Sequence, residues 1–175
     1  MRFELRPHPD TPPDRSDMTV EVWLERWDDG RAEISYHLHA PTDEIVLPDQ
    51  PRRGPADELW KTTCFELFVR EDAGYREYNF SPAGAWAAYR FDGYRSGMRP
   101  LELEHSPQID SDDNGDALLL DAIIDLADDG RFGLAAVVEE ASGTKSYWAL
   151  AHGPGKPDFH AEACFAGTLP PPTAA

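Results

Sequence analysis

Strict alternation of apolar and polar residues over 19–39 is the feature that most constrains the fold of this chain. The apolar members of the pattern are Val20, Val22, Leu24, Ile34, Tyr36 and Leu38. A period of two residues is typical of half-buried β-strands. A three-residue loop at 28–30 puts both apolar faces on one side, whereas a two-residue turn would set them on opposite sides. The sequence therefore predicts a hairpin that pairs Leu24 with Ile34 and holds Gly30 in the left-handed conformation.

Short apolar segments continue along the rest of the chain. Further strands are expected at 63–70, 75–80, 85–91, 117–126, 132–139 and 145–151. No long run carries apolar residues at helical spacing, and 16 prolines and 13 glycines separate the segments. The pattern predicts an all-β fold, a jelly-roll-like β-sandwich of two antiparallel sheets. We expect one domain over 1–169, followed by a Pro-rich flexible tail at 170–175.

Charge argues against two classes of partner. The chain has 33 acidic and 16 basic residues among 175, which gives a formal charge of −17. Such a surface repels nucleic acids and anionic membranes, and no apolar run is long enough to span a membrane. The N-terminal residues lack the apolar core of a secretory signal, so a cytoplasmic location is expected. Cys64 and Cys164 lie in apolar settings and are predicted to be buried core residues rather than metal ligands.

Glu66 is an anomaly, because it lies in the middle of an almost wholly apolar strand. A buried carboxylate must be paired or hydrogen-bonded. It is either half of a structural pair with an arginine or tyrosine, or an acceptor in a ligand slot. We expect a neighbouring arginine to keep it ionised.

Aromatic and polar residues alternate over 75–98. A sugar ring needs an aromatic face beside fixed hydrogen-bonding groups, and this segment supplies both, although its rings could equally be core. The candidate ligand residues here are Tyr78, Asn79, Trp86, Arg90 and Arg95.

Two loops carry further polar candidates. His152, Asp158 and His160 lie around a Gly/Pro loop, where they could form loop hydrogen bonds, contact a ligand at the rim or, least favoured by their spacing, hold a metal. The acidic loop with Asp110, Asp112 and Asn114 matches the front of an EF-hand but departs from it further on. We therefore expect a solvated hairpin loop there and no bound metal, with calcium as the weak alternative.

Several short motifs resemble a known family. These are Leu-Trp-Lys-x-x-Cys-Phe-Glu-Leu-Phe at 59–68, Tyr-Asn-Phe-Ser-Pro at 78–82, Tyr-Arg-x-Gly-Met at 94–98, Tyr-Trp-Ala-Leu-x-His at 147–152 and Pro-Asp-Phe-His at 157–160. Together they are similar to the bacterial DOMON-like proteins, which are related to family 9 carbohydrate-binding modules. The resemblance covers residues 59–165 and implies a jelly roll with a ligand slot at one end.

The resemblance also implies how a ligand would be held. It implies that a sugar end lies between two aromatic rings, with one clamp tryptophan six residues before a glutamate. Trp60 and Glu66 stand at that spacing, and Trp148 is a loose match for the second ring. Either Arg90 or Arg95 would supply a guanidinium.

These observations predict a non-catalytic binding module for a small saccharide or sugar derivative, without a cofactor. No nucleophile elbow, phosphate-binding loop or zinc-protease motif is present. One alternative is an enzyme or enzyme accessory subunit that uses Glu66 with His152 or His160 as acid and base. Another is a haem-binding redox module, for which Met18 and Met98 form no clear axial pair with a histidine.

Overall fold

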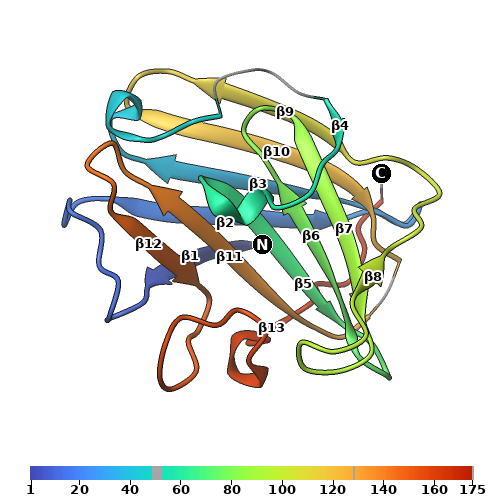
Figure 1. The fold of residues 1–175 in the computed structure, drawn as a ribbon. Helices are drawn as coiled ribbons and strands as arrows, with labels where there is room; N and C mark the ends of the chain where they lie inside the picture. The colour runs from blue at the N-terminus through green and yellow to red at the C-terminus, as the bar shows by residue number, and fades with distance from the viewer. Residues whose placement is uncertain (49–52, 128, 175) are drawn as a thin grey trace.

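The computed structural model describes residues 1–48, 53–127 and 129–174, and these residues form an all-β fold (Figure 1). The strands are β1 (Arg2–Pro7), β2 (Thr19–Arg26), β3 (Arg31–His39), β4 (Gly54–Pro55), β5 (Cys64–Arg70), β6 (Tyr75–Phe80), β7 (Ala85–Phe91), β8 (Arg99–Pro100), β9 (Gln108–Asp113), β10 (Ala117–Asp125), β11 (Arg131–Glu139), β12 (Lys145–Ala149) and β13 (Gly167–Thr168). The helices are three 3-10 turns, η1 (Thr42–Glu44), η2 (Leu59–Lys61) and η3 (Glu162–Cys164). None of the helices in these described ranges could cross a membrane.

The strands form one continuous, curled sheet. Their order is β4-β7-β6-β5-β11-β12-β1-β2-β3-β10-β9, with β8 added to β7 and β13 to β11. The two halves join at β1, which pairs with β2 along Arg2–Leu5 and with β12 at Arg6 and Pro7. The β4–β7 pair is parallel. The all-β prediction is confirmed, and the strands form a curled mixed sheet in which β1 pairs with both halves; the finer prediction of a two-sheet jelly roll stays a prediction.

The predicted hairpin of β2 and β3 is confirmed with its register. Leu24 pairs with Ile34, and the remaining apolar residues pair as the parity argument requires. The backbone N–H of Trp27 donates to the carbonyl of Arg31 at 2.8 Å, which leaves three residues in the loop. Gly30 has φ +87°, the left-handed conformation that glycine adopts without strain.

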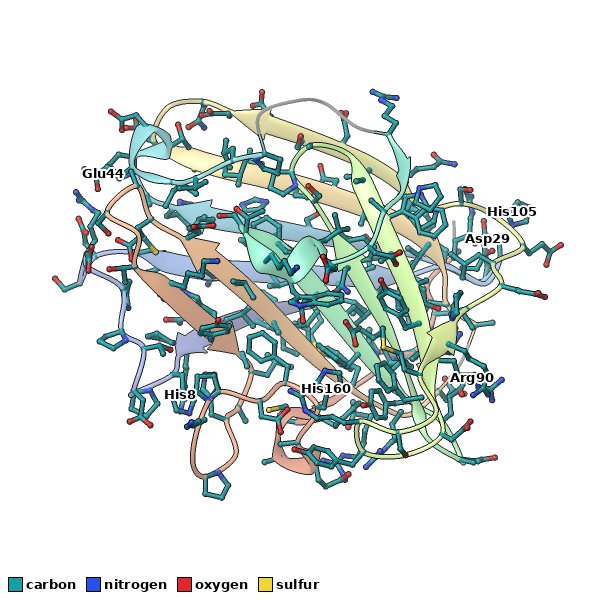
Figure 2. The ribbon with its side chains drawn as sticks, viewed as in Figure 1. His8, Asp29, Glu44, Arg90, His105 and His160 are labelled. Atoms are coloured by element: carbon teal, nitrogen blue, oxygen red, sulfur yellow. The ribbon has the colours of Figure 1, made fainter. Side chains whose placement is uncertain are left out.

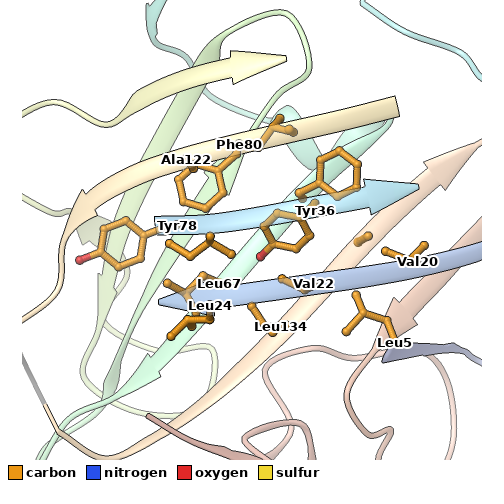
Figure 3. Packing of buried hydrophobic residues seen from close by; sticks show 14 of the residues in the cluster. Leu5, Val20, Val22, Leu24, Tyr36, Leu67, Tyr78, Phe80, Ala122 and Leu134 are labelled. Atoms are coloured by element: carbon orange, nitrogen blue, oxygen red, sulfur yellow. The ribbon is translucent and has the colours of Figure 1, made fainter. Parts of the chain in front are cut away.

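The sheet curls so that two layers of strands face each other. The front layer consists of β5, β6, β7, β11 and β12, and the back layer of β1, β2, β3, β9 and β10; Figure 1 shows the front strands crossing the back ones. Side chains fill the space between the layers (Figure 2). Figure 3 shows Leu24 and Tyr36 of the back layer packed beside Leu67 and Tyr78 of the front layer, all at most 1% exposed. The Tyr36 hydroxyl crosses the interface and donates to the Glu66 carbonyl at 2.8 Å.

The front layer is also covered on its outer face. A second apolar cluster there joins Phe68, Tyr75, Phe91, Val137, Phe159 and Phe165, with the partly buried Leu59 and Tyr147 packed against it. The segment 153–165 lies close to the sheet where Gly133 has no side chain, since a Cβ there would come within 2.7 Å of the Cys164 carbonyl oxygen. This contact fixes the segment that carries Asp158 and His160.

Both cysteines are buried, and neither forms a disulfide in the described part of the chain. The C-terminal segment, expected to be a flexible tail, makes backbone contacts with β2 here. The Thr173 N–H donates to the Arg26 carbonyl at 2.8 Å, and the Arg26 guanidinium donates to the Pro170 carbonyl at 2.8 Å. These contacts run as far as Thr173.

Candidate functional site

A cavity of about 320 Å³ opens on the outer face of the front layer, the face opposite the core. Its polar lining residues are Glu66, Glu77, Arg95, Asp158 and His160, and its apolar lining residues are Trp60, Phe91, Met98, Val137, Tyr147, Pro157 and Phe159. The structure thus brings together five of the residues singled out in the sequence: Trp60, Glu66, Arg95, Asp158 and His160. A mainly apolar hollow with a few convergent polar groups is the usual form of a small-molecule site.

Strand alternation places two carboxyl groups in this cavity. Glu66 of β5 lies between residues that face the core, so its side chain points to the outer face. Glu77 of β6 is on the same face. Glu66 pairs in register with Asn79, two residues beyond Glu77, so the two glutamates are diagonal neighbours on adjacent strands.

Glu66 is buried without a hydrogen-bonding partner. It is 3% exposed, and its carboxyl makes no hydrogen bond to any residue that the structure describes. Burial raises the pKa of Glu66 well above its usual range; the negative charge of Glu77 adds to the rise, and Arg95 opposes it only in part. The sequence led us to expect that an arginine keeps Glu66 ionised; Arg95 favours the ionised form here, whereas burial and Glu77 oppose it.

Glu77 was missed by the sequence reasoning. It is 5% exposed, and the Asn79 amide donates to its Oε1 at 2.8 Å. Burial raises the pKa of Glu77 to about 7, although the Asn79 hydrogen bond and Arg95 both lower it. β6 also carries Arg76 and Asn79, so a carboxyl at this position does not stand out as Glu66 does in β5, and only the pairing of the two strands brings Glu77 to the cavity.

His160, labelled in Figure 2, belongs to the covering segment 153–165 and lines the same cavity as Glu66 and Glu77. Its Nδ1 is 2.7 Å from the Tyr75 hydroxyl, and its Nε2 is 3.8 Å from Oε2 of Glu77. Burial lowers the pKa of His160 to about 4, so the ring is neutral near pH 7. Because both ring nitrogens face protein groups, His160 and the neighbouring Met98 do not fit the axial ligation of a haem. Met18, the other candidate, is buried in the core.

Arg95 and Asp158 form an ion pair at the rim of the cavity. The Nη2 and Nε of Arg95 lie 2.8 and 3.2 Å from Oδ1 of Asp158, and the Tyr94 hydroxyl donates to Oδ2. Although burial opposes the change, these hydrogen bonds lower the pKa of Asp158. The arginine is therefore committed to Asp158 rather than to either glutamate.

Of the tryptophan, tyrosine and phenylalanine side chains that line the cavity, Trp60 and Tyr147 are the two that are not fully buried, since Phe91 and Phe159 belong to the outer apolar cluster. Trp60, on η2, is 36% exposed and meets the Tyr89 ring edge-on at a centroid distance of 6.2 Å. Tyr147 of β12 lies partly buried beside Phe159, with 6.0 Å between ring centroids. The next residue, Trp148, points the other way into the core, is 2% exposed and donates its indole N–H to the Ser146 hydroxyl. The second ring in this cavity is thus Tyr147 and not Trp148.

The remaining candidates lie outside the cavity. Tyr78 is in the core, and Trp86 packs partly buried against the same core. Asn79 reaches the cavity only through its hydrogen bond to Glu77. The Arg90 side chain is paired with Glu71 at 2.9 Å, on the other face of β7. His152 is close to the Arg6 carbonyl and to the His8 ring, so the structure does not bring it to Glu66.

The acidic loop is part of a hairpin. Asp110 and Asp112 belong to β9, and the Asn114 side chain accepts hydrogen bonds from the N–H groups of Asp116 and Ala117 at 3.1 and 2.9 Å. Within the described ranges no three His, Cys, Asp or Glu side chains are grouped to hold a metal ion. The Asn114 side-chain oxygen therefore accepts hydrogen bonds from the backbone of its own turn.

We expect EDTA to leave the melting temperature unchanged. An ion that bound only the folded state would stabilise it, and its removal would lower the melting temperature. Differential scanning calorimetry with and without EDTA, and with added calcium, makes the measurement. A clear drop with EDTA, restored by calcium, would contradict the prediction.

Comparison with known proteins defines the class of fold. No protein family model matches the chain, and no curated protein matches its sequence. Several solved structures have a similar fold. The chain is similar to a "putative carbohydrate-binding protein" from Bacteroides uniformis ATCC 8492, with 16% identity, a TM-score of 0.63, and coverage of 97% of this chain and 85% of that one.

Two further similar structures are of a family 9 carbohydrate-binding module from Caldicellulosiruptor kristjanssonii. The complex with glucose is 12% identical, with a TM-score of 0.51 and coverage of 81% of this chain and 71% of that one. The complex with cellotriose is 11% identical, with a TM-score of 0.51 and coverage of 89% and 74%. At these identities the likeness establishes the fold.

Proposed function

We propose that this chain is a non-catalytic binding module whose outer-face cavity takes a small saccharide or sugar derivative. The observation that carries the proposal is the pairing of two accessible aromatic rings with buried hydrogen-bonding groups in one cavity of about 320 Å³. The fold supports it, because a family 9 module of similar fold was solved with glucose and with cellotriose. The finer features of the resemblance, a jelly roll and a DOMON-like ancestry, belong to the same proposal.

The cavity offers the two kinds of contact that a sugar requires. The rings of Trp60 and Tyr147 give apolar surfaces for the C–H face of a pyranose. Glu66, Glu77 and Arg95 provide donors and acceptors for hydroxyl groups, and a protonated Glu66 can do both. Such groups give specificity because each is costly to leave unpaired when the wrong ligand binds.

The alternative of an enzyme has one specific observation in its favour. Glu66 and Glu77, both with raised pKa values, share the cavity with a neutral His160. Pairs of titratable groups with shifted pKa values are typical of acid–base catalysis. Detection of a reaction product after incubation with a sugar would favour this alternative.

Isothermal titration calorimetry against a panel of mono- and disaccharides tests the proposed function. We expect saturable binding of at least one sugar, with no product detected by chromatography after long incubation. Arg90→Ala is a matched control, because it removes a side chain from the outside of the cavity and should leave binding unchanged. The absence of binding across the panel at millimolar concentrations would overturn the proposal.

A further inference from the structure

The cavity is lined by more carboxyl groups than cationic groups. Three carboxyl groups line it, from Glu66, Glu77 and Asp158, whereas Arg95 is the single arginine or lysine among the described lining residues. Arg95 is already paired with Asp158. His160 is neutral near pH 7, so it adds no positive charge. Neither glutamate therefore forms an ion pair with an arginine or lysine of the described lining, although Arg95 favours the ionised form of both.

Glu66 is the clearest sign of what the cavity lacks. Its carboxyl faces the cavity, is almost fully buried and has no hydrogen-bonding partner in the described parts of the chain. A largely desolvated carboxyl that opens only to a cavity favours a ligand that donates hydrogen bonds to it. Glu77 uses Oε1 to accept from Asn79, while its Oε2 lies 3.8 Å from His160 Nε2, which is beyond hydrogen-bond length.

We propose that the saccharide bound here is an amino sugar, and that its ammonium group lies between the carboxyl groups of Glu66 and Glu77. The inference rests on the proposed function and names the ligand class. An ammonium has three donors and a full positive charge, so it can satisfy both carboxyl groups at once. Charge-assisted hydrogen bonds of this kind are about twice as strong as neutral ones.

Binding of an ammonium also moves protons. It favours the ionised form of both glutamates, so protons leave the pair when the amino sugar binds. The titratable groups around the pair are Cys64, Tyr75, Tyr89, Arg95, Asp158 and His160, from β5, β6, β7 and the two covering loops. Arg95 repels an ammonium, but its pairing with Asp158 offsets this charge locally.

The experiment compares sugars that differ at a single group. Glucose, glucosamine, 6-amino-6-deoxyglucose and N-acetylglucosamine are titrated at about pH 7 by calorimetry, in two buffers of different ionisation enthalpy. We expect at least one free amine to bind about tenfold or more tightly than glucose, with proton release, and N-acetylglucosamine to lose this gain. At about pH 5 the preference should shrink, because the carboxyl groups are then protonated.

Two variants and a control separate this site from general attraction to an acidic protein. Glu66→Gln and Glu77→Gln should each reduce the preference for the amine, with both variants folded. Asp112→Asn, which removes an exposed carboxylate from β9, should keep it. Cyclohexylamine, a cationic ring without hydroxyls, should bind more weakly than the amino sugars.

The outcomes distinguish the two proposals. If glucose binds as tightly as every amine tested, the amino-sugar inference falls and the saccharide-binding function stands. If no sugar binds, both fall. If Asp112→Asn loses the preference as the glutamate variants do, or if cyclohexylamine binds as tightly as glucosamine, the selectivity is general charge attraction and the inference is overturned.

Discussion

Replacing Trp60 with alanine should abolish measurable saccharide binding and leave most of the free energy of unfolding intact. The indole stands at the mouth of the cavity, 36% exposed, and gives the more accessible of the two ring faces. Its removal deletes a large apolar contact surface from the ligand, which rim residues cannot replace. Since the ring is not part of either buried cluster, the cost to stability should be about 1 kcal/mol.

Trp148→Ala is the matched control, because it removes the same side chain from the core. Trp148 is 2% exposed, and such truncations cost about 3–5 kcal/mol. For a chain of this size the melting temperature should fall by about 10 °C. Thermal unfolding and calorimetric titration of both variants make the comparison. Normal binding by Trp60→Ala, or a loss of stability equal to that of Trp148→Ala, would contradict the assignment of the cavity as a sugar site.

The strands that could be predicted are those with one or two buried faces. The β2–β3 hairpin followed from parity, because only one loop length puts Leu24 and Ile34 on the same side of the sheet. The bounds of β6 and β7 also agree with the sequence reading, since a Ser-Pro-Ala-Gly turn separates them. In each case the pattern of apolar and turn-forming residues along the sequence matched the bounds or the register of the strands.

The two longest strands that the sequence did not predict, β1 and β9, lack that signal. β9 is acidic and mostly exposed, and it is an edge strand held by its pairing with β10. β1 buries only Leu5 fully, yet it joins the two halves of the sheet. A strand that is held by backbone pairing and buries few side chains leaves no apolar pattern, so composition alone indicated a loop at β9 and nothing at β1.

In the candidate site, too, some features could be predicted from the sequence and others could not. Glu66 could be found because a carboxyl in an apolar strand must be explained, and its spacing from Trp60 was informative. The choice between Tyr147 and Trp148 depends on which face of β12 meets the core, which one strand taken alone does not determine. The raised pKa of Glu66 could not be predicted either, because it depends first on how far the fold buries the carboxyl and then on the nearby Glu77.

The last prediction concerns the pH dependence of stability. The pKa of Glu77 is about 7 in the folded protein and 4.5 as an ordinary glutamate, so the unfolded chain ionises first and stability is lost as pH rises from about 4.5 to 7. The change amounts to about 3 kcal/mol. His160 acts in the opposite sense, because its lowered pKa of about 4 makes stability rise between about pH 4 and 6.5. In the native chain His160 therefore opposes Glu77, whereas the raised pKa of Glu66 acts in the same direction as Glu77.

Glu77→Gln should remove the contribution of Glu77 to this pH dependence. Glutamine keeps the shape and the acceptor for Asn79 but cannot ionise, so the variant should match the native chain at about pH 4 and exceed its stability by about 3 kcal/mol at about pH 8. Removing Glu77 also relieves its repulsion of Glu66, which acts in the same direction. Urea unfolding at the two pH values measures both differences, and Glu104→Gln, at an exposed loop position, controls for the general effect of one negative charge fewer. A difference between variant and native chain that does not change with pH would show that Glu77 is not held in a desolvated site, and the charge argument for the cavity would fail with it.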